Sequence, residues 1–132
     1  MLDQIKLEKV IFIDIETVPL FPSHNLLSDK WKRLWERKSG YIGKDDETSE
    51  ELYERAGIYA EFGKIICISI GIIRSIEGKK SLRVKSFAGD DEKQLLVDFS
   101  ALLRNHFKAS DYLLCAHNGK EFDFPYIARR ML

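Results

Sequence analysis

The stretch Val10–Thr17, VIFIDIET, places two carboxylates one residue apart in an otherwise apolar run. Short β-branched and aromatic runs of this kind predict a central strand that is covered on both faces. Side chains alternate between the faces of a strand, so Asp14 and Glu16 share one face. The isoleucines on either side of Asp14 then point to the opposite face. Two like charges on one face repel each other unless a cation lies between them.

A divalent metal is one explanation for this acidic pair. Hard cations such as Mg²⁺ and Mn²⁺ prefer carboxylate oxygens, and the pair offers no soft ligand. The alternative is that both acids lie on a solvated strand face, which is common at the surface of sheets. The apolar neighbours favour the metal, and Thr17-Val18-Pro19 ends the strand at once. In open sheets with helical crossovers, ligands commonly bind at such strand ends.

The segment between Leu26 and Phe62 has helical patterns. Gly40 and Gly43 are expected to break a first helix, and Thr48 with Glu51 has the form of a capping box that opens a second one. The first helix carries a basic face, which is typical either of an amphipathic helix with solvated lysines or of a nucleic-acid contact, and the first reading is favoured. The expected apolar positions are Leu27, Trp31, Leu34 and Trp35 in the first helix and Leu52, Ala56, Tyr59 and Ala60 in the second.

The remaining chain alternates strands and helices. Strands are predicted over 65–73, 82–87 and 112–116, of which the first two form a hairpin across Glu77-Gly78. A helix capped by Asp90 or Asp91 follows the hairpin, and a last helix carries Pro125 in its first turn. This order predicts an α/β fold, a mixed sheet with helices packed against it, in a single domain.

Composition narrows the function classes. The chain has 132 residues, and 21 Lys and Arg balance 21 Asp and Glu. A protein that grips duplex nucleic acid through many phosphates is usually basic, so nucleic-acid binding here would be local or metal-assisted. Cys67 and Cys115 lie in apolar runs and are expected to be buried thiols. No stretch has the length of a membrane span and the N-terminus lacks a leader pattern, so we expect a cytoplasmic protein.

A second motif, NGKEFDFPYI over 118–127, follows the predicted strand at 112–116 and opens the last helix. Together, DIET at 14–17 and this motif resemble the first two motifs of the DEDD 3′-5′ exonucleases. The greatest similarity is to the proofreading-exonuclease domain of family B DNA polymerases and its stand-alone bacterial relatives. The resemblance implies a ribonuclease H-like fold and covers most of the chain. Both motifs in the right order and structural context are more specific than either one alone.

The resemblance also implies roles for individual residues. Asp14, Glu16 and Asp123 would be the catalytic carboxylates and would hold two Mg²⁺ or Mn²⁺ ions. Two such ions activate water on one side of a phosphodiester and stabilise the leaving oxygen on the other. Asn118 would position the terminal nucleotide, and Thr17 and Phe122 are further substrate-binding candidates. Phe122 and Tyr126 can share one helix face, so core packing is expected for at least one of them.

The family's third motif, a Tyr or His four positions ahead of a fourth Asp, is not found in the sequence. We therefore expect residues 1–132 to form a C-terminally truncated exonuclease domain, roughly two-thirds of a typical one, with a helical insertion at about 21–62. The expected function is metal-dependent 3′-5′ hydrolysis at single-stranded DNA ends, in repair or proofreading, with a polymerase or repair partner. These residues alone should be weakly active or inactive. The alternatives are a noncatalytic ribonuclease H-like module that binds nucleic acid or a polymerase, and a 3′-5′ exoribonuclease.

Overall fold

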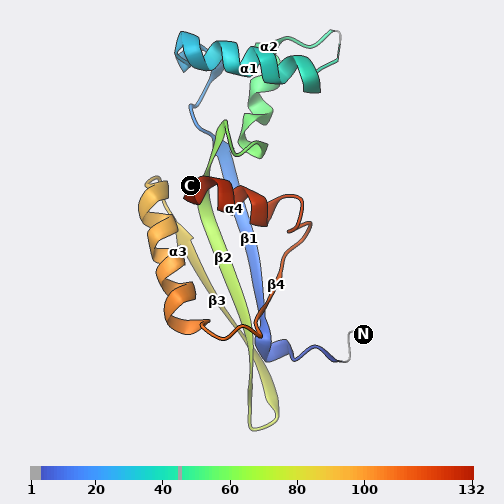
Figure 1. Ribbon diagram of the computed structural model, residues 1–132, viewed down its shortest axis with the longest axis vertical. Helices are drawn as coiled ribbons and strands as arrows, with labels where there is room; N and C mark the ends of the chain where they lie inside the picture. Colours follow the sequence, from blue (N-terminus) through green and yellow to red (C-terminus); the bar gives the residue numbers. More distant parts are fainter. Residues whose placement is uncertain (1–3, 45) are drawn as a thin grey trace. The chain divides into compact units, whose positions relative to one another are not determined.

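The computed structural model describes residues 4–44 and 46–132. It is an α/β structure with a four-stranded mixed sheet in the order β3-β2-β1-β4 (Figure 1). The strands are β1 (Val10–Pro19), β2 (Gly63–Ile76), β3 (Lys79–Ala88) and β4 (Leu113–Cys115). The α-helices are α1 (Asp29–Ile42), α2 (Ser49–Leu52), α3 (Glu92–His106) and α4 (Asp123–Met131). Short 3-10 helices lie at Leu7–Lys9, His24–Leu26 and Tyr53–Ile58.

The chain forms two compact units. One unit is Thr17–Lys64, which contains the expected insertion at 21–62, and the other consists of Met1–Glu16 and Ile65–Leu132. We call them the helical unit and the sheet unit. Within the described residues, no helix combines the length and apolar character needed to cross a bilayer.

Strand pairing in the sheet unit is set by one hairpin and one short parallel ladder. β2 and β3 pair antiparallel across a turn at Glu77 and Gly78, whose φ angles of 50° and 75° suit a tight hairpin turn. β4 pairs in parallel with only the first three residues of β1, from Val10↔Leu113 to Phe12↔Cys115. Beyond Phe12, the edge of β1 that faces β4 is therefore open to other hydrogen-bonding groups.

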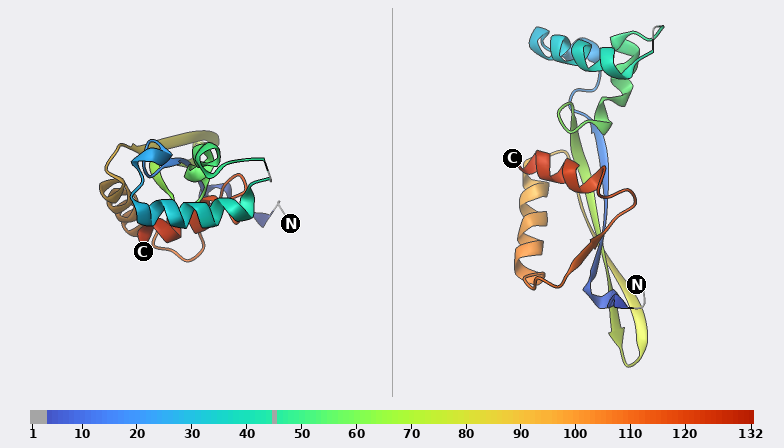
Figure 2. Two further views of the ribbon diagram at one scale, coloured as in Figure 1. Left: turned by 90° about the horizontal axis from the view of Figure 1, so that it is seen from above. Right: turned by 45° about the vertical axis from the view of Figure 1, so that its right-hand side comes forward.

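The sheet unit buries one face of its sheet beneath helices. Figures 1 and 2 show α3 and α4 on the same side of the strands. The core is aliphatic and aromatic, with Ile11, Ile13, Ile15, Ile68 and Ile70 from the strands and Leu95, Leu96, Phe99, Tyr126 and Ile127 from the helices. Apolar burial of this kind contributes most of the favourable free energy of folding.

The other face of the sheet is largely bare. Asp14 and Glu16 are exposed, and the apolar side chains of Leu82 and Val84 on β3 are 64% and 62% exposed. The prediction that the first strand is covered on both faces was therefore wrong, although its alternation of buried and exposed positions is confirmed. Cys115 is exposed and Cys67 half-buried, so the expectation of two buried thiols was also wrong.

The helical unit has a separate core built around Trp35. This side chain is fully buried, and its Nε1 donates to the Ser49 carbonyl at 2.6 Å. Its ring makes edge-on contacts with Tyr53 and Phe62 at centroid distances of 5.4 and 5.1 Å. Leu27, Leu52, Ala56 and these three aromatic residues form one buried cluster.

The helical unit differs from the expected one in three respects. The expected second helix ends at Leu52 and is followed by the 3-10 helix Tyr53–Ile58, so Ala56 lies in that 3-10 helix and Tyr59 and Ala60 lie beyond it. α1 continues through Gly40 and ends at Ile42, with Gly43 as its C-cap, so only the second glycine breaks the helix. Leu34 is 44% exposed, so its expected place on the buried face was wrong. The capping box is confirmed, because the Glu51 backbone N–H donates to Thr48 Oγ1 and the Thr48 N–H donates to the Glu51 carboxylate.

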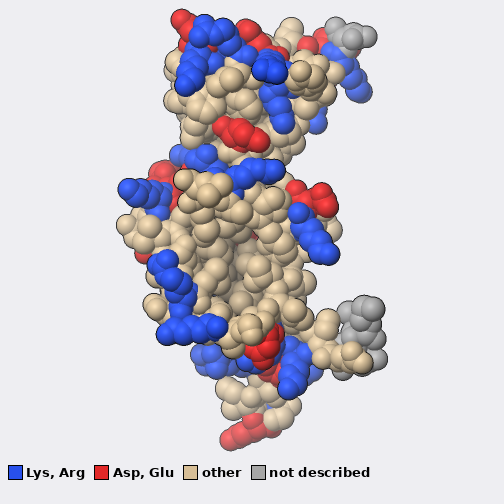
Figure 3. Space-filling view, viewed as in Figure 1, with Lys and Arg blue, Asp and Glu red and all other residues tan. Residues whose placement is uncertain are grey.

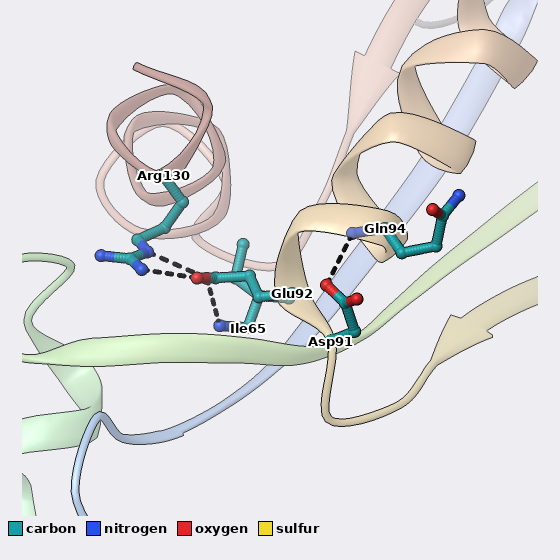
Figure 4. A network of polar contacts seen from close by, with 5 residues as sticks. All are labelled: Ile65, Asp91, Glu92, Gln94 and Arg130. Atoms are coloured by element: carbon teal, nitrogen blue, oxygen red, sulfur yellow. Dashed lines mark hydrogen bonds and ion pairs between the residues drawn. The ribbon is translucent and has the colours of Figure 1, made fainter.

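A polar network joins three elements of the sheet unit (Figure 4). Glu92, in the first turn of α3, accepts from the Ile65 backbone N–H at 2.8 Å and from Arg130 Nε at 2.9 Å. Arg130 Nη2 also donates to Glu92 Oε2 at 2.5 Å, which gives a two-pronged ion pair. The adjacent Asp91 caps α3 by accepting from the Gln94 N–H at 3.0 Å. The network fixes the last turn of α4 against the start of β2, and α4 carries Asp123 at its opposite end.

Candidate functional site

Asp123 is the central residue of the candidate site. It begins α4, and its side chain is buried, with 3% of the residue exposed. The backbone N–H of Ile15 donates to its carboxyl group. This bond is available because β4 has already ended at the level of Phe12. The second motif is therefore docked on the first motif, at the open edge of β1.

The position of Asp123 disfavours the ionised form of its carboxyl group. Burial raises the pKa of its carboxyl group, and the nearby negative charge of Asp14 raises it further. The N–H groups of Asp123 itself and of Ile15, together with the charge of His117, act in the opposite direction. The net result is a raised pKa, which means that the protein holds this carboxylate at a cost that a nearby cation would offset.

The two acids of β1 lie on one face of the strand, as the alternation of side chains between strand faces requires. Asp14 and Glu16 are exposed, while Ile13 and Ile15 on the opposite face are 5% and 6% exposed. Asp14 also lines a shallow hollow of about 390 Å³ on the bare sheet face, together with Phe12 and Gly71. The charge of Asp14 thus acts on the carboxyl group of Asp123, and Glu16 lies on the same strand face as Asp14.

The loop before α4 carries the predicted substrate-binding residues. Asn118 has a φ of 56°, a left-handed conformation that asparagine tolerates, and its carbonyl accepts from the N–H groups of Glu121 and Phe122. Its side chain is exposed. Phe122 is half-buried and contacts the ring of Tyr126 at 5.4 Å, whereas Tyr126 is buried in the core. At least one of the two rings thus packs in the core, as expected.

Thr17 differs from the other candidates. It is the first residue of the helical unit and is half-buried. Asp14, Glu16, Asn118, Phe122 and Asp123 all belong to the sheet unit. These five residues therefore lie in one unit, and among them only the Asp14 charge is seen to act on Asp123; roles for Glu16, Asn118, Phe122 and Thr17 remain predictions.

The donor set suits a hard cation. Asp14 and Asp123 offer only carboxylate oxygens, and Mg²⁺ is commonly held by one or two carboxylates together with water and substrate phosphate. Over residues 4–44 and 46–132, no three His, Cys, Asp or Glu side chains are grouped so that they could hold a metal ion among themselves. A cation held here would therefore draw on the carboxylates of Asp14 and Asp123 and would need further ligands, such as water or substrate phosphate.

The raised pKa of Asp123 predicts a pH-dependent stability. The folded protein binds this proton more tightly than the unfolded chain does, so folding is favoured most below the ordinary pKa of an aspartate. Stability then falls as pH rises through the raised pKa. Asp123→Asn keeps an acceptor for the Ile15 N–H and removes the titration. In EDTA, the free energy of unfolding is measured with urea between pH 3 and 7. We expect that of Asp123→Asn to rise relative to that of the parent as pH rises. A difference between the two proteins that does not change with pH would contradict the raised pKa of Asp123.

Comparison with protein-family models, with curated proteins and with solved structures finds no match to this chain. Function must therefore be inferred from the site itself and from its surroundings.

On the face seen in Figure 3, basic and acidic side chains are interspersed. Over the whole chain the formal net charge is zero.

Proposed function

We propose that this protein is a metal-dependent 3′-5′ exonuclease with a ribonuclease H-like sheet, which hydrolyses phosphodiester bonds at single-stranded DNA ends. The observation that carries the proposal is that Asp14 and Asp123, from the two sequence motifs, act on each other electrostatically. These residues are 109 positions apart, and one lies on a strand while the other opens a helix. The charge of Asp14 nevertheless acts on the carboxyl group of Asp123, which Ile15 also binds.

The residues of the site have separable roles in this proposal. Asp14 and Asp123 would hold a Mg²⁺ or Mn²⁺ ion, and Glu16 would add a carboxylate from the same strand face when substrate is present. A bound cation of this kind lowers the pKa of water and neutralises charge that develops on phosphate. The exposed amide of Asn118 and the half-buried ring of Phe122 would orient the last nucleotide. Asp123 is kept in place by the Ile15 N–H and by the Glu92–Arg130 pair at the other end of α4.

A cleavage assay tests the proposal. The chain is incubated at high concentration with a 5′-labelled single strand of DNA, or with the matching RNA, in Mg²⁺, Mn²⁺ or EDTA. We expect slow, stepwise shortening from the 3′ end that depends on divalent metal and is faster on DNA. Shortening that persists in EDTA, or cuts only at internal positions, would contradict the proposal. Preference for the RNA strand would instead identify an exoribonuclease.

A further inference from the structure

The sheet unit has a second concave site at the end of the sheet away from Asp123. Its volume is about 650 Å³, within the range of pockets that bind small ligands. The pocket lies where the hairpin of β2 and β3 extends past the last turn of α3, and Lys9 borders it just before β1 begins. Lys9 and Asp14 are five residues apart, or roughly 17 Å along an extended chain. The pocket is therefore separate from the carboxylate site.

The walls of this pocket are basic. The strand register places Arg74, Arg83 and Lys85 on one face of the hairpin, and His106 at the end of α3 faces the same space. Glu8 is the one acidic residue among the described lining residues. The pocket has a local excess of positive charge, because three arginine and lysine side chains lie on one strand face and only one carboxylate lies among the described lining residues. The zero net charge of the chain does not predict such an excess.

Two of these cations have no partner of their own. Within residues 4–44 and 46–132, neither the Arg74 nor the Arg83 guanidinium takes part in a side-chain hydrogen bond or an ion pair, and both side chains are exposed. Lys9, by contrast, is bound to Asp111 at 3.2 Å. Lys85 lies over the ring of Phe87, 4.8 Å from its centre. The two arginines are thus available for an anion, and guanidinium groups bind phosphate oxygens in a planar, two-pronged manner.

The rest of the pocket is apolar and aromatic. Ile70 and Ile72 form part of its lining on the sheet, and Leu102 adds an aliphatic side chain from α3. Phe107 and Tyr112 lie edge to face, with ring centres 5.1 Å apart and planes at 90°, and Lys9 Nζ lies over the Tyr112 ring, 4.4 Å from its centre. A site with free guanidinium groups on one side and an aromatic wall on another suits a ligand that carries both an anion and a flat ring.

We propose that this pocket binds a nucleotide unit, with its phosphate on Arg74 and Arg83 and its base against the ring of Phe107 on the aromatic wall. The unit is either a free mononucleotide or one residue of a single strand. The inference goes beyond the exonuclease proposal, because binding here needs neither a divalent metal nor cleavage. An inorganic anion would use the arginines alone, and an acidic peptide would leave the aromatic wall without a matching flat group.

A binding experiment in EDTA tests this site separately from the carboxylates. Fluorescence anisotropy follows a short, labelled oligothymidylate, with thymidine monophosphate, inorganic phosphate or an oligoglutamate peptide as competitor. The test variant is Arg74→Gln with Arg83→Gln. The control is Arg33→Gln with Arg37→Gln, which removes the same charge from exposed positions of α1.

We expect the test variant to bind the oligonucleotide at least about tenfold more weakly, because a hydrogen bond to a charged group is worth that factor or more. The control variant should bind like the parent. Competition by thymidine monophosphate identifies the free nucleotide as a sufficient ligand, and its failure to compete assigns the site to a residue within a strand. Equal losses in both variants would overturn the proposal. The proposal would also be overturned if inorganic phosphate or the peptide displaced the labelled oligonucleotide at the concentration at which the nucleotide does.

Discussion

Asp14→Asn is expected to lower metal-dependent shortening of a single strand by at least about a hundredfold. The substitution keeps the size of the side chain and removes one of the two carboxylates that would hold the metal in the proposed site. Loss of a metal ligand removes several kcal/mol of transition-state stabilisation, and each 1.4 kcal/mol is a factor of about ten in rate. Cleavage rates are measured from a 5′-labelled strand, and Mn²⁺ affinity is measured by calorimetry as a readout that does not require turnover.

Asp90→Asn is the matched control for this substitution. Asp90 is exposed in the loop before α3, in the same unit, and lies outside the motif residues. The control should retain both the cleavage rate and the Mn²⁺ affinity of the parent. Parent-like cleavage by Asp14→Asn would remove this residue from the mechanism.

Asp14→Asn should also lower the pKa of Asp123, because the Asp14 charge is one of the causes that raise it.

Trp35→Ala is expected to destabilise the helical unit by about 3–5 kcal/mol, the usual cost of truncating a buried aromatic side chain to alanine. Trp35 is fully buried, contacts Tyr53 and Phe62, and is hydrogen-bonded to the Ser49 carbonyl. The substitution leaves a cavity and also removes the donor for that carbonyl. Urea unfolding followed by near-ultraviolet circular dichroism measures the loss.

Leu34→Ala serves as the control, because Leu34 is the preceding residue of α1 and is 44% exposed. It should change the free energy of unfolding by less than about 1 kcal/mol, since surface substitutions away from special features have small effects. Similar losses at positions 34 and 35 would contradict the burial assigned to this helix. Urea unfolding of Trp35→Phe should show an intermediate loss, because phenylalanine restores a ring but lacks the indole donor.

Local patterns in the sequence specify most of the elements. The capping box at Thr48, the cap at Asp91 and the hairpin turn at Glu77-Gly78 are all present, because each depends on backbone groups only a few residues away. Gly40 shows the limit of such reasoning. A glycine in a helix costs only about 1 kcal/mol, and the packing of Trp35 against the helical unit's core outweighs it.

Coverage of the sheet could not be predicted from periodicity. A run of apolar residues predicts a buried strand, but the chain places both α3 and α4 on one side, which leaves Leu82 and Val84 exposed on the other. Cys115 is exposed for a different reason, because β4 is only three residues long and lies at the edge of the sheet. Which helix covers which face depends on contacts distant in sequence.

The candidate site was predicted in part. Alternation along a strand places Asp14 and Glu16 on one face, and this arrangement is confirmed. The approach of Asp123 depends on where β4 ends relative to β1, and local patterns in the sequence do not determine this register. The pocket at Arg74 and Arg83 was missed for a related reason. Its cations come together only when the register of the hairpin is known.

The most direct test of the central claim is to locate Mn²⁺ by its anomalous scattering in crystals of this protein soaked with the metal. We expect a peak within coordination distance of carboxylate oxygens from both Asp14 and Asp123, and we expect it to be absent in Asp123→Asn crystals. A saturating soak that gives no peak at this pair, or a peak that survives the Asp123→Asn substitution there, would contradict the proposal that the two motifs share a metal ion.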